Sequence, residues 1–142
     1  MTTIDPAERV DAIAPQPDPD SAAWWQGLRE HRILLQLCGG CRRPRHPPMP
    51  RCPWCATRTF EEVESAGRGV VYAFVTAHVA VSPGYGAELP YTVATVELDE
   101  GPRLLGRVES LLPLAIGAGV MARFRDHPSW TELYFVTDPH RT

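Results

Sequence analysis

Four cysteines gather in one short stretch of the 142-residue chain, and their spacing is typical of a metal-binding ribbon. Cys38 and Cys41 form one C-x2-C pair, and Cys52 and Cys55 form a second pair ten residues later. A C-x2-C turn places two thiolates on one side of a tight backbone knuckle, and two facing knuckles make the tetrahedral sulfur cage that zinc accepts. Because four thiolates fill that tetrahedron, the spacing predicts one structural zinc ion per chain.

Three other uses of these cysteines stay open at this stage. Two disulfides are disfavoured in a chain that we expect in the cytoplasm, where thiols are kept reduced. A redox dithiol requires one C-x2-C at the start of a helix, whereas two occur here in tandem. An iron site of the rubredoxin kind would use the same four ligands. The tandem spacing favours zinc among these uses.

The segment from Cys38 to Thr59 contains five arginines and no acidic residue. These arginines are Arg42, Arg43, Arg45, Arg51 and Arg58. Guanidinium groups bind the phosphates of nucleic acids and of phosphorylated cofactors, and a solvated charged loop is the alternative. Because the segment has almost no apolar core of its own, we expect its folding to depend on the metal.

The residues before the cysteines are expected to supply a lead-in, a helix and a strand. Residues 1–19 are rich in proline and aspartate, which predicts a flexible lead-in. A helical segment is expected within 20–32, capped by Asp20 or Ser21, with Trp24 and Leu28 on one face and Trp25 beside them. A strand over 33–37 then leads into a ribbon that spans 33–62.

The region 63–142 reads as a small β domain. Residues 70–81 alternate with apolar groups on both faces, which predicts a central strand, and 82–90 form a long loop. Further strands are expected over 91–98, 103–108, 120–124 and 133–136. Five strands in about 70 residues without a helical period predict an antiparallel barrel or sandwich.

Composition narrows the function classes. The net charge is −3, and all 14 basic residues are arginine. This balance argues against a protein that coats nucleic acid. No apolar run is long enough to span a bilayer, and the first residues lack the pattern of a signal peptide, so we expect a cytoplasmic protein without a membrane span.

Motifs for catalysis are missing from the sequence. The five histidines are scattered, and His78 is interpreted as a barrel residue rather than a base. There is no nucleophile elbow, P-loop or dinucleotide fingerprint. We therefore expect no catalytic residues and no activity by the chain alone.

The order of these features resembles the DUF35 family of zinc-ribbon OB-fold proteins. The residues that carry the resemblance are 20–28, 35–38, 50–55, 67–72, 90–98, 100–101 and 117–120. The resemblance implies a mainly β protein with an N-terminal helix, a rubredoxin-like zinc ribbon and a C-terminal five-stranded OB-fold barrel over 63–142. Residues 111–116 are more apolar than the family pattern leads us to expect.

The resemblance also implies a role. Proteins of this family bind thiolase-like enzymes, lipid-transfer-type aldolases or MaoC-type hydratases, all of which handle acyl-CoA. It therefore implies a non-catalytic accessory subunit in a hetero-oligomer, with Arg42, Arg43 and Arg68 as candidates for contacts with CoA phosphates. Aromatic side chains that look exposed fit such a partner role. They are Trp24, Trp25, Trp54 and Trp130. For Trp24 and Trp25, docking on the core of the chain itself is the other interpretation.

Two other functions are weighed against this one. A single-stranded nucleic-acid-binding module is supported by the arginine-rich segment and opposed by the net charge of −3. An independent CoA-binding or thioesterase-like enzyme could use arginines to hold phosphates, but no nucleophile or base stands in register with them. Its arginine candidates are Arg42, Arg43, Arg68, Arg103, Arg107 and Arg123.

Overall fold

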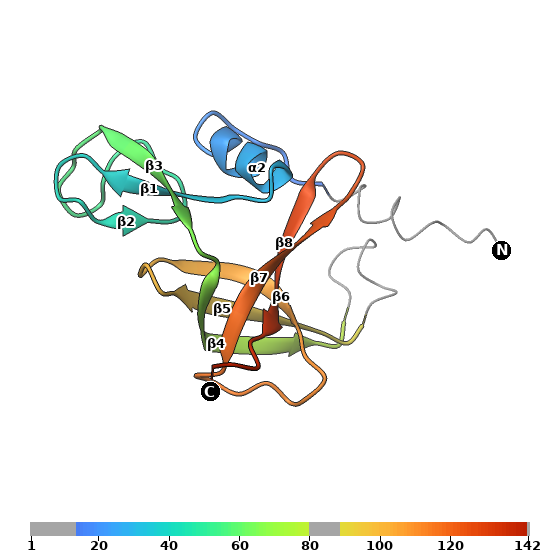
Figure 1. Ribbon diagram of the computed structural model, residues 1–142. Coiled ribbons are helices and arrows are strands. Elements are labelled where there is room, and N and C mark those ends of the chain that lie inside the picture. The colour runs from blue at the N-terminus through green and yellow to red at the C-terminus, as the bar shows by residue number, and fades with distance from the viewer. Residues whose placement is uncertain (1–13, 80–88, 142) are drawn as a thin grey trace.

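The computed structural model describes residues 14–79 and 89–141 and shows a mainly β molecule with one short helix. Helix α2 (Ala22–Arg29) is followed by β1 (Ile33–Cys38), β2 (Pro44–Arg45), β3 (Phe60–Ser65), β4 (Arg68–Ala77), β5 (Tyr91–Leu98), β6 (Arg103–Glu109), β7 (Gly119–Asp126) and β8 (Thr131–Thr137). Strands β1 to β3 form a small sheet, and β4 to β8 close into a barrel. Figure 1 shows the barrel below α2, with the small sheet to one side.

Helix α2 begins after a tight turn that its own polar groups hold. The Ser21 N–H donates to the Asp18 carboxylate at 2.8 Å, and the Asp18 N–H donates back to the Ser21 hydroxyl. Trp24 and Leu28 are buried on the inner face of the helix, as the four-residue spacing predicts. The interpretation of Trp24 as exposed was wrong, because it packs into the core of the chain itself, and Trp25 is half-buried.

The barrel follows the strand order β4-β5-β6-β8-β7, and β7 closes it by pairing with β4. All neighbouring strands are antiparallel except β6 and β8, which are parallel. The expectation of a wholly antiparallel barrel therefore needs this one correction. A closed five-stranded barrel with these connections is the OB fold.

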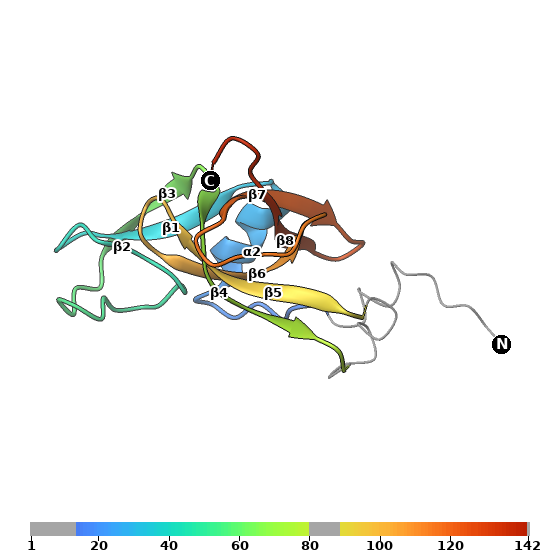
Figure 2. The ribbon, with the colours of Figure 1, turned by 90° about the horizontal axis from the view of Figure 1, so that it is seen from below.

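Strand β4 differs from the central strand that its alternation predicts. Val71 is buried, but after a bulge between Val71 and Ala73 the strand runs with exposed apolar side chains, including Val75 at 67% exposure. Figure 2 shows the far ends of β4 and β5 extending beyond the barrel. His78 follows the end of β4 and is exposed, so the interpretation of His78 as a residue of a barrel strand was wrong. Residues 80–88, which include most of the expected loop, lie outside the described part.

The small sheet contains two strands that the sequence patterns did not predict. β3 pairs antiparallel with β1 over six residue pairs, from Ile33 opposite Ser65 to Cys38 opposite Phe60. β2 is only two residues long and pairs with the other side of β1. Together these strands hold the first knuckle, which contains Cys38 and Cys41, against the segment that follows the second knuckle, which contains Cys52 and Cys55.

One hydrophobic core joins the barrel to the helix and to β1. Phe135, Val96 and Val120 fill the barrel, while Leu28 and Leu35 reach the same cluster from α2 and β1. No helix in the described ranges is long and apolar enough to cross a membrane. The shared core fixes the ribbon relative to the barrel, because apolar burial is the main favourable contribution to folding.

Candidate metal centre

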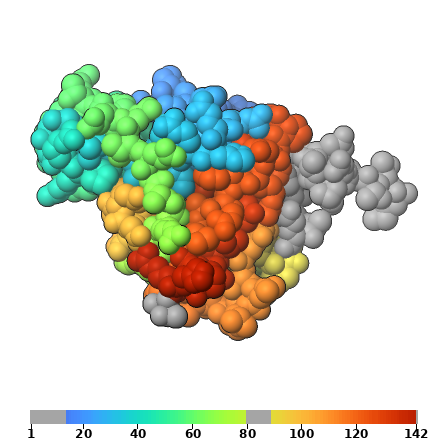
Figure 3. Space-filling view, in the orientation of Figure 1, coloured from blue at the N-terminus to red at the C-terminus, as the bar shows by residue number. Residues whose placement is uncertain are grey.

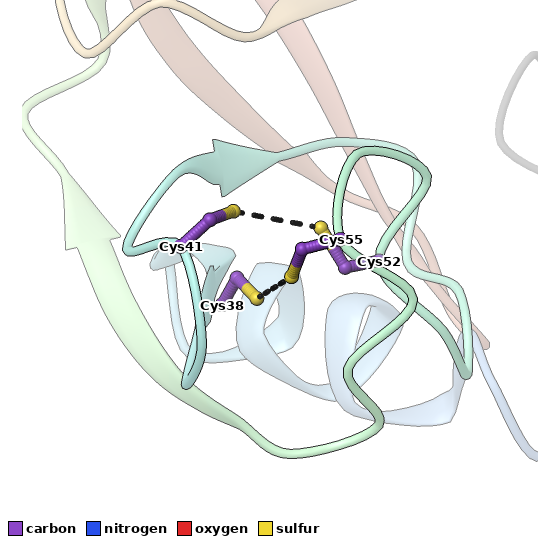
Figure 4. A group of neighbouring side chains, drawn as sticks. All are labelled: Cys38, Cys41, Cys52 and Cys55. Atoms are coloured by element: carbon purple, nitrogen blue, oxygen red, sulfur yellow. Dashed lines mark hydrogen bonds between the residues drawn. The ribbon is translucent and has the colours of Figure 1, made fainter.

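The four cysteine side chains converge on one point at the end of the small sheet. Their sulfur atoms all lie within 4.8 Å of one another, with 3.5 Å between Cys38 and Cys55 and 3.7 Å between Cys41 and Cys52 (Figure 4). These separations exceed the roughly 2.05 Å of an S–S bond and are near the roughly 3.8 Å edge of a tetrahedron with zinc–sulfur bonds of about 2.3 Å. The four thiols are therefore positioned to bind one metal ion.

Each knuckle closes in the same way. The residue after its second cysteine has a positive φ, 62° at Arg42 and 64° at Ala56. The Arg42 N–H donates to the Cys38 carbonyl, and the Ala56 N–H donates to the Cys52 carbonyl. Two matching backbone turns thus present four sulfur atoms to one centre.

Close approach of the knuckles explains the glycines in the first one. A Cβ added at Gly40 would strike the Thr57 hydroxyl and lie 3.2 Å from the Cys55 sulfur. A Cβ at Gly39 would lie 2.5 Å from the Thr59 hydroxyl. Their role is to leave room for the facing segment, since their backbone angles are ordinary.

Hydrogen bonds favour the thiolate at Cys38 and Cys55 but not at Cys41. The backbone hydrogen bond of Arg43 lowers the pKa of the Cys41 thiol, but burial and contacts with the other three sulfurs outweigh it and raise that pKa to about 11. The Thr57 hydroxyl lies 3.2 Å from the Cys55 sulfur, and this contact lowers the pKa of the Cys55 thiol to about 6. The backbone hydrogen bond from Cys41 lowers the pKa of the Cys38 thiol. Because thiolates rather than thiols bind metal ions, these contacts prepare the site for a cation.

A buried polar network supports the segment between the knuckles. Arg45 is buried, and its Nε donates to the Gln36 side-chain oxygen at 2.8 Å while its Nη2 donates to the Met49 carbonyl. The Met49 N–H donates to the same Gln36 oxygen. The expectation that Arg45 belongs to an exposed phosphate-binding patch was therefore wrong, because its guanidinium links this segment to β1.

Next to this network, His46 packs against the helix. Its ring lies 4.3 Å from the Trp24 ring, and burial lowers the pKa of His46 to about 4. Neither Gln36 nor His46 was singled out for this role by sequence reasoning, since single polar residues carry no periodic signal. His46 joins the ribbon to α2 through this ring contact, whereas Gln36 links β1 to the segment between the knuckles.

The three arginines expected to contact CoA phosphates lie in two places. Arg42 and Arg43 are in the ribbon, where Arg42 pairs with Glu61 at 2.7 Å and the Arg43 guanidinium lies over the Trp54 ring. Arg68 begins β4 in the barrel and lies 3.8 Å from the carboxylate of Asp138. Two of the three therefore already face carboxylates.

A second candidate site is an apolar groove between α2 and the barrel, with a volume of about 290 Å³. Its walls include Trp25, Trp130, Val93 and Leu105. Arg29 donates to the carbonyl of His127 and so ties the helix to the β7–β8 turn that carries Trp130. The groove is therefore preformed, which lowers the entropic cost of binding into it.

The cysteine cage on a small sheet and the five-stranded barrel define a zinc-ribbon protein with an OB-fold domain. Family models agree: the ChsH2 rubredoxin-like zinc ribbon domain matches residues 25–61, and the ChsH2 C-terminal OB-fold domain matches residues 62–125. A DUF35 domain-containing scaffold protein of Methanocaldococcus jannaschii is 34% identical over 105 residues, which are 71% of this chain and 74% of that protein. The chain belongs to the DUF35 family.

Two further relatives are similar to this chain. A solved chain described as "Ltp2-ChsH2(DUF35) aldolase" superposes with a TM-score of 0.80 at 35% identity, over 87% of this chain and 98% of that one. A probable enoyl-CoA hydratase alpha subunit of Thermomonospora curvata is 37% identical over 115 residues, which are 80% of this chain. The chain spans 35% of the length of that subunit.

Proposed function

We propose that this chain is a non-catalytic accessory subunit that binds and stabilises an acyl-CoA-processing enzyme of the thiolase-like, lipid-transfer-type aldolase or MaoC-type hydratase class. The proposal is carried by apolar side chains that are exposed on the outside of the barrel. The names of two relatives, a hydratase alpha subunit and a DUF35 chain of an aldolase, support the same class of partner.

This docking face consists of Val75, Val93 and Leu105 on the outside of β4, β5 and β6. Val75 lies opposite Val93 in the strand register, and Leu105 lies opposite Thr95 one row further along. Leu105 is 72% exposed. Val93 and Leu105 also line the groove between α2 and the barrel, called the tryptophan groove because Trp25 and Trp130 are among its walls. The docking face and the groove therefore form one surface. Contiguous apolar surface of this kind marks interaction sites in proteins whose exteriors are otherwise polar.

The groove also indicates the kind of occupant. Small-molecule sites have volumes of roughly 300–1,000 Å³, and the groove lies at the lower end of that range. A protein surface that inserts one or two apolar side chains beside Trp25 and Trp130 fits both the groove and the flat strands next to it. Trp25 and Trp130 are half-buried in the free chain, and tryptophans that a partner covers within an apolar patch are typical of interface hot spots.

Co-expression tests the proposal. The chain is produced in turn with a thiolase-like enzyme, an Ltp2-type aldolase and a MaoC-type hydratase, and each mixture is analysed by size exclusion with mass measurement. We expect a complex with at least one of them. Leu105→Asp should weaken that complex at least tenfold, because a carboxylate would be buried in an apolar contact. Leu112→Asp, the same change on the exposed β6–β7 loop, is the matched control.

A chain that stays monomeric beside all three enzymes would contradict the proposal. Equal loss of binding in Leu105→Asp and Leu112→Asp would show that the docking face is not the surface that contacts the enzyme.

Finer parts of the proposal concern the ligands and the limits of the units. The bound metal is zinc, one ion per chain, held by the four cysteines; the matching zinc-ribbon family and the sulfur geometry support this. Contacts with CoA phosphates by Arg42, Arg43 and Arg68 and a location in the cytoplasm also belong to it. The limits 1–19, 20–32, 33–62 and 63–142 belong to the proposal as well, and the change of matching family between residues 61 and 62 supports only the last of these boundaries.

A further inference from the structure

Positively and negatively charged side chains are unevenly distributed along the sequence of this chain. The segment from Cys38 to Thr59 holds five arginines and no carboxylate, whereas all 17 acidic residues and the other nine arginines lie elsewhere. A zinc ion with four thiolates contributes two formal negative charges, so the segment stays positive when the metal is bound. The rest of the chain is acidic, which makes the segment from Cys38 to Thr59, rather than the ribbon as a whole, a positive patch on an otherwise negative molecule.

The positive patch is exposed at the outer end of the ribbon. We define the ribbon tip as Arg43, Arg51, Trp54 and Arg58, all of which are exposed. Figure 3 shows the ribbon as a lobe that projects beyond the barrel. A projecting lobe can reach a second molecule while the barrel makes a separate contact.

Backbone geometry brings the members of the ribbon tip together. The Cys52 N–H donates to the Thr57 carbonyl at 2.9 Å, so the chain doubles back and the next residues on its two arms are Arg51 and Arg58. The Arg43 guanidinium lies 5.2 Å from the centre of the Trp54 ring, which connects the first knuckle to the second. The tip is thus one surface made by both knuckles.

The charges of the ribbon tip are not neutralised within the described part of the chain. Arg42 pairs with Glu61, but Arg43, Arg51 and Arg58 form no ion pair with any described residue. Trp54 is 53% exposed. A tryptophan beside one arginine, with two further exposed arginines on the same loop, has the composition of an interface hot spot, in which the ring is buried by the partner and the cations meet carboxylates.

We infer that the ribbon tip is a second docking surface, and that it binds an acidic patch on the partner enzyme, with Trp54 at the centre and Arg43, Arg51 and Arg58 around it. This inference rests on the proposed function for the existence of the partner, and it assigns Arg43 to that partner in place of the contact with CoA. Charge complementarity selects the occupant: a compact carboxylate patch matches three arginines on one lobe, whereas an extended polyanion would run onto the acidic remainder of the chain.

The test measures the affinity of the full-length, zinc-loaded chain for the enzyme that forms a complex in the co-expression experiment. Arg51→Glu with Arg58→Glu should weaken binding at least tenfold and should abolish most of its dependence on salt. Arg123→Glu reverses an exposed arginine on β7 and should leave the affinity within about twofold. Trp54→Ala should weaken binding with little change in its salt dependence. Zinc content and thermal unfolding confirm that each variant is folded.

Several results would overturn the inference. Unchanged affinity in the folded Arg51→Glu, Arg58→Glu variant would show that the tip does not contact the enzyme. Displacement of the enzyme by millimolar free CoA, lost in Arg43→Glu, would assign the tip to CoA phosphates. Salt-sensitive binding of a dT20 oligonucleotide, lost in the same tip variants, would assign it to nucleic acid. Absence of any complex with wild-type chain would instead remove the proposed function and this inference with it.

Discussion

At the scale of single residues, the ribbon depends on polar side chains placed where water is excluded. Gln36 serves two donors with one oxygen, and the buried Arg45 forms no ion pair with any residue in the described part of the chain. His46 occupies the contact between the ribbon and α2 and packs against Trp24. Because buried polar groups are costly when a partner is lost, these residues specify one arrangement of ribbon and helix.

The buried His46 should make stability depend on pH. A free histidine takes up a proton near pH 6.5, but burial lowers the pKa of His46 to about 4. Between these values the unfolded chain binds more protons, so the free energy of unfolding falls as the pH is lowered, by up to about 3 kcal/mol. Urea unfolding from pH 7.5 to pH 4.5 measures this loss.

The variant His46→Phe is the control for that experiment. It keeps a ring against Trp24 and removes the titrating group, so its stability should fall less over the same interval. Zinc release by acid affects both proteins equally, and the difference between them isolates His46. Identical pH profiles for the two proteins would show that His46 is not held neutral by burial.

At the scale of elements, the ribbon and the barrel are stabilised differently. Apart from β1, whose Ile33 and Leu35 join the common core, the ribbon is held by turns, short strands and the cysteine cage. The barrel is filled by its own apolar side chains, as at Gly106, where a Cβ would lie 2.8 Å from the Phe135 ring. The two units should therefore respond differently when the metal is removed.

Metal removal should unfold the knuckles and spare the barrel. Chelation, or the variant Cys55→Ser, removes the cage; Cys55 is exposed, so its substitution leaves no buried cavity. Amide hydrogen exchange should then become fast in β2 and the knuckles, while β5 and β8 stay protected. Adding zinc back to the chelated wild-type protein should restore protection. Slow exchange in the knuckles of a protein shown to be metal-free would contradict this account.

The strands of the barrel could be predicted from the sequence better than those of the ribbon. The strands over 91–98, 103–108, 120–124 and 133–136 lie within β5, β6, β7 and β8, because each alternates along a half-buried face. β3 was missed because three of its six residues are glutamates, which lie on both of its faces, and its apolar positions are few. The exposure of β4 beyond Val71 could not be predicted, since an alternating apolar strand has the same pattern whether another part of the chain or a partner covers it.

The functional site could likewise be predicted only in part from the sequence. The cysteine spacing alone identified all four sulfur ligands, because a C-x2-C turn is a local structure. The contact of Arg43 with Trp54 and the pairing of Arg42 with Glu61 join residues from separate turns and strands, which no local pattern encodes. Sequence therefore predicted the metal site and left the arrangement of the arginines to the fold.

At the scale of the whole molecule, the chain has two kinds of surface. The docking face and its tryptophan groove are apolar, and the ribbon tip is positive. An apolar contact supplies affinity through buried area, while a charged contact supplies orientation and speed of association. A subunit with both surfaces is suited to bind one enzyme in one orientation, which is the central claim of the proposed function.

Affinity purification of the tagged chain from its native cell, followed by mass spectrometry and by reconstitution with the purified candidate, tests this claim most directly. We expect a stoichiometric complex with an acyl-CoA enzyme of the thiolase-like, aldolase or MaoC-type class. That complex should re-form from the purified proteins and should be lost in Leu105→Asp. Recovery of the chain alone as a stable monomer, or with nucleic acid as its stoichiometric partner, would contradict it.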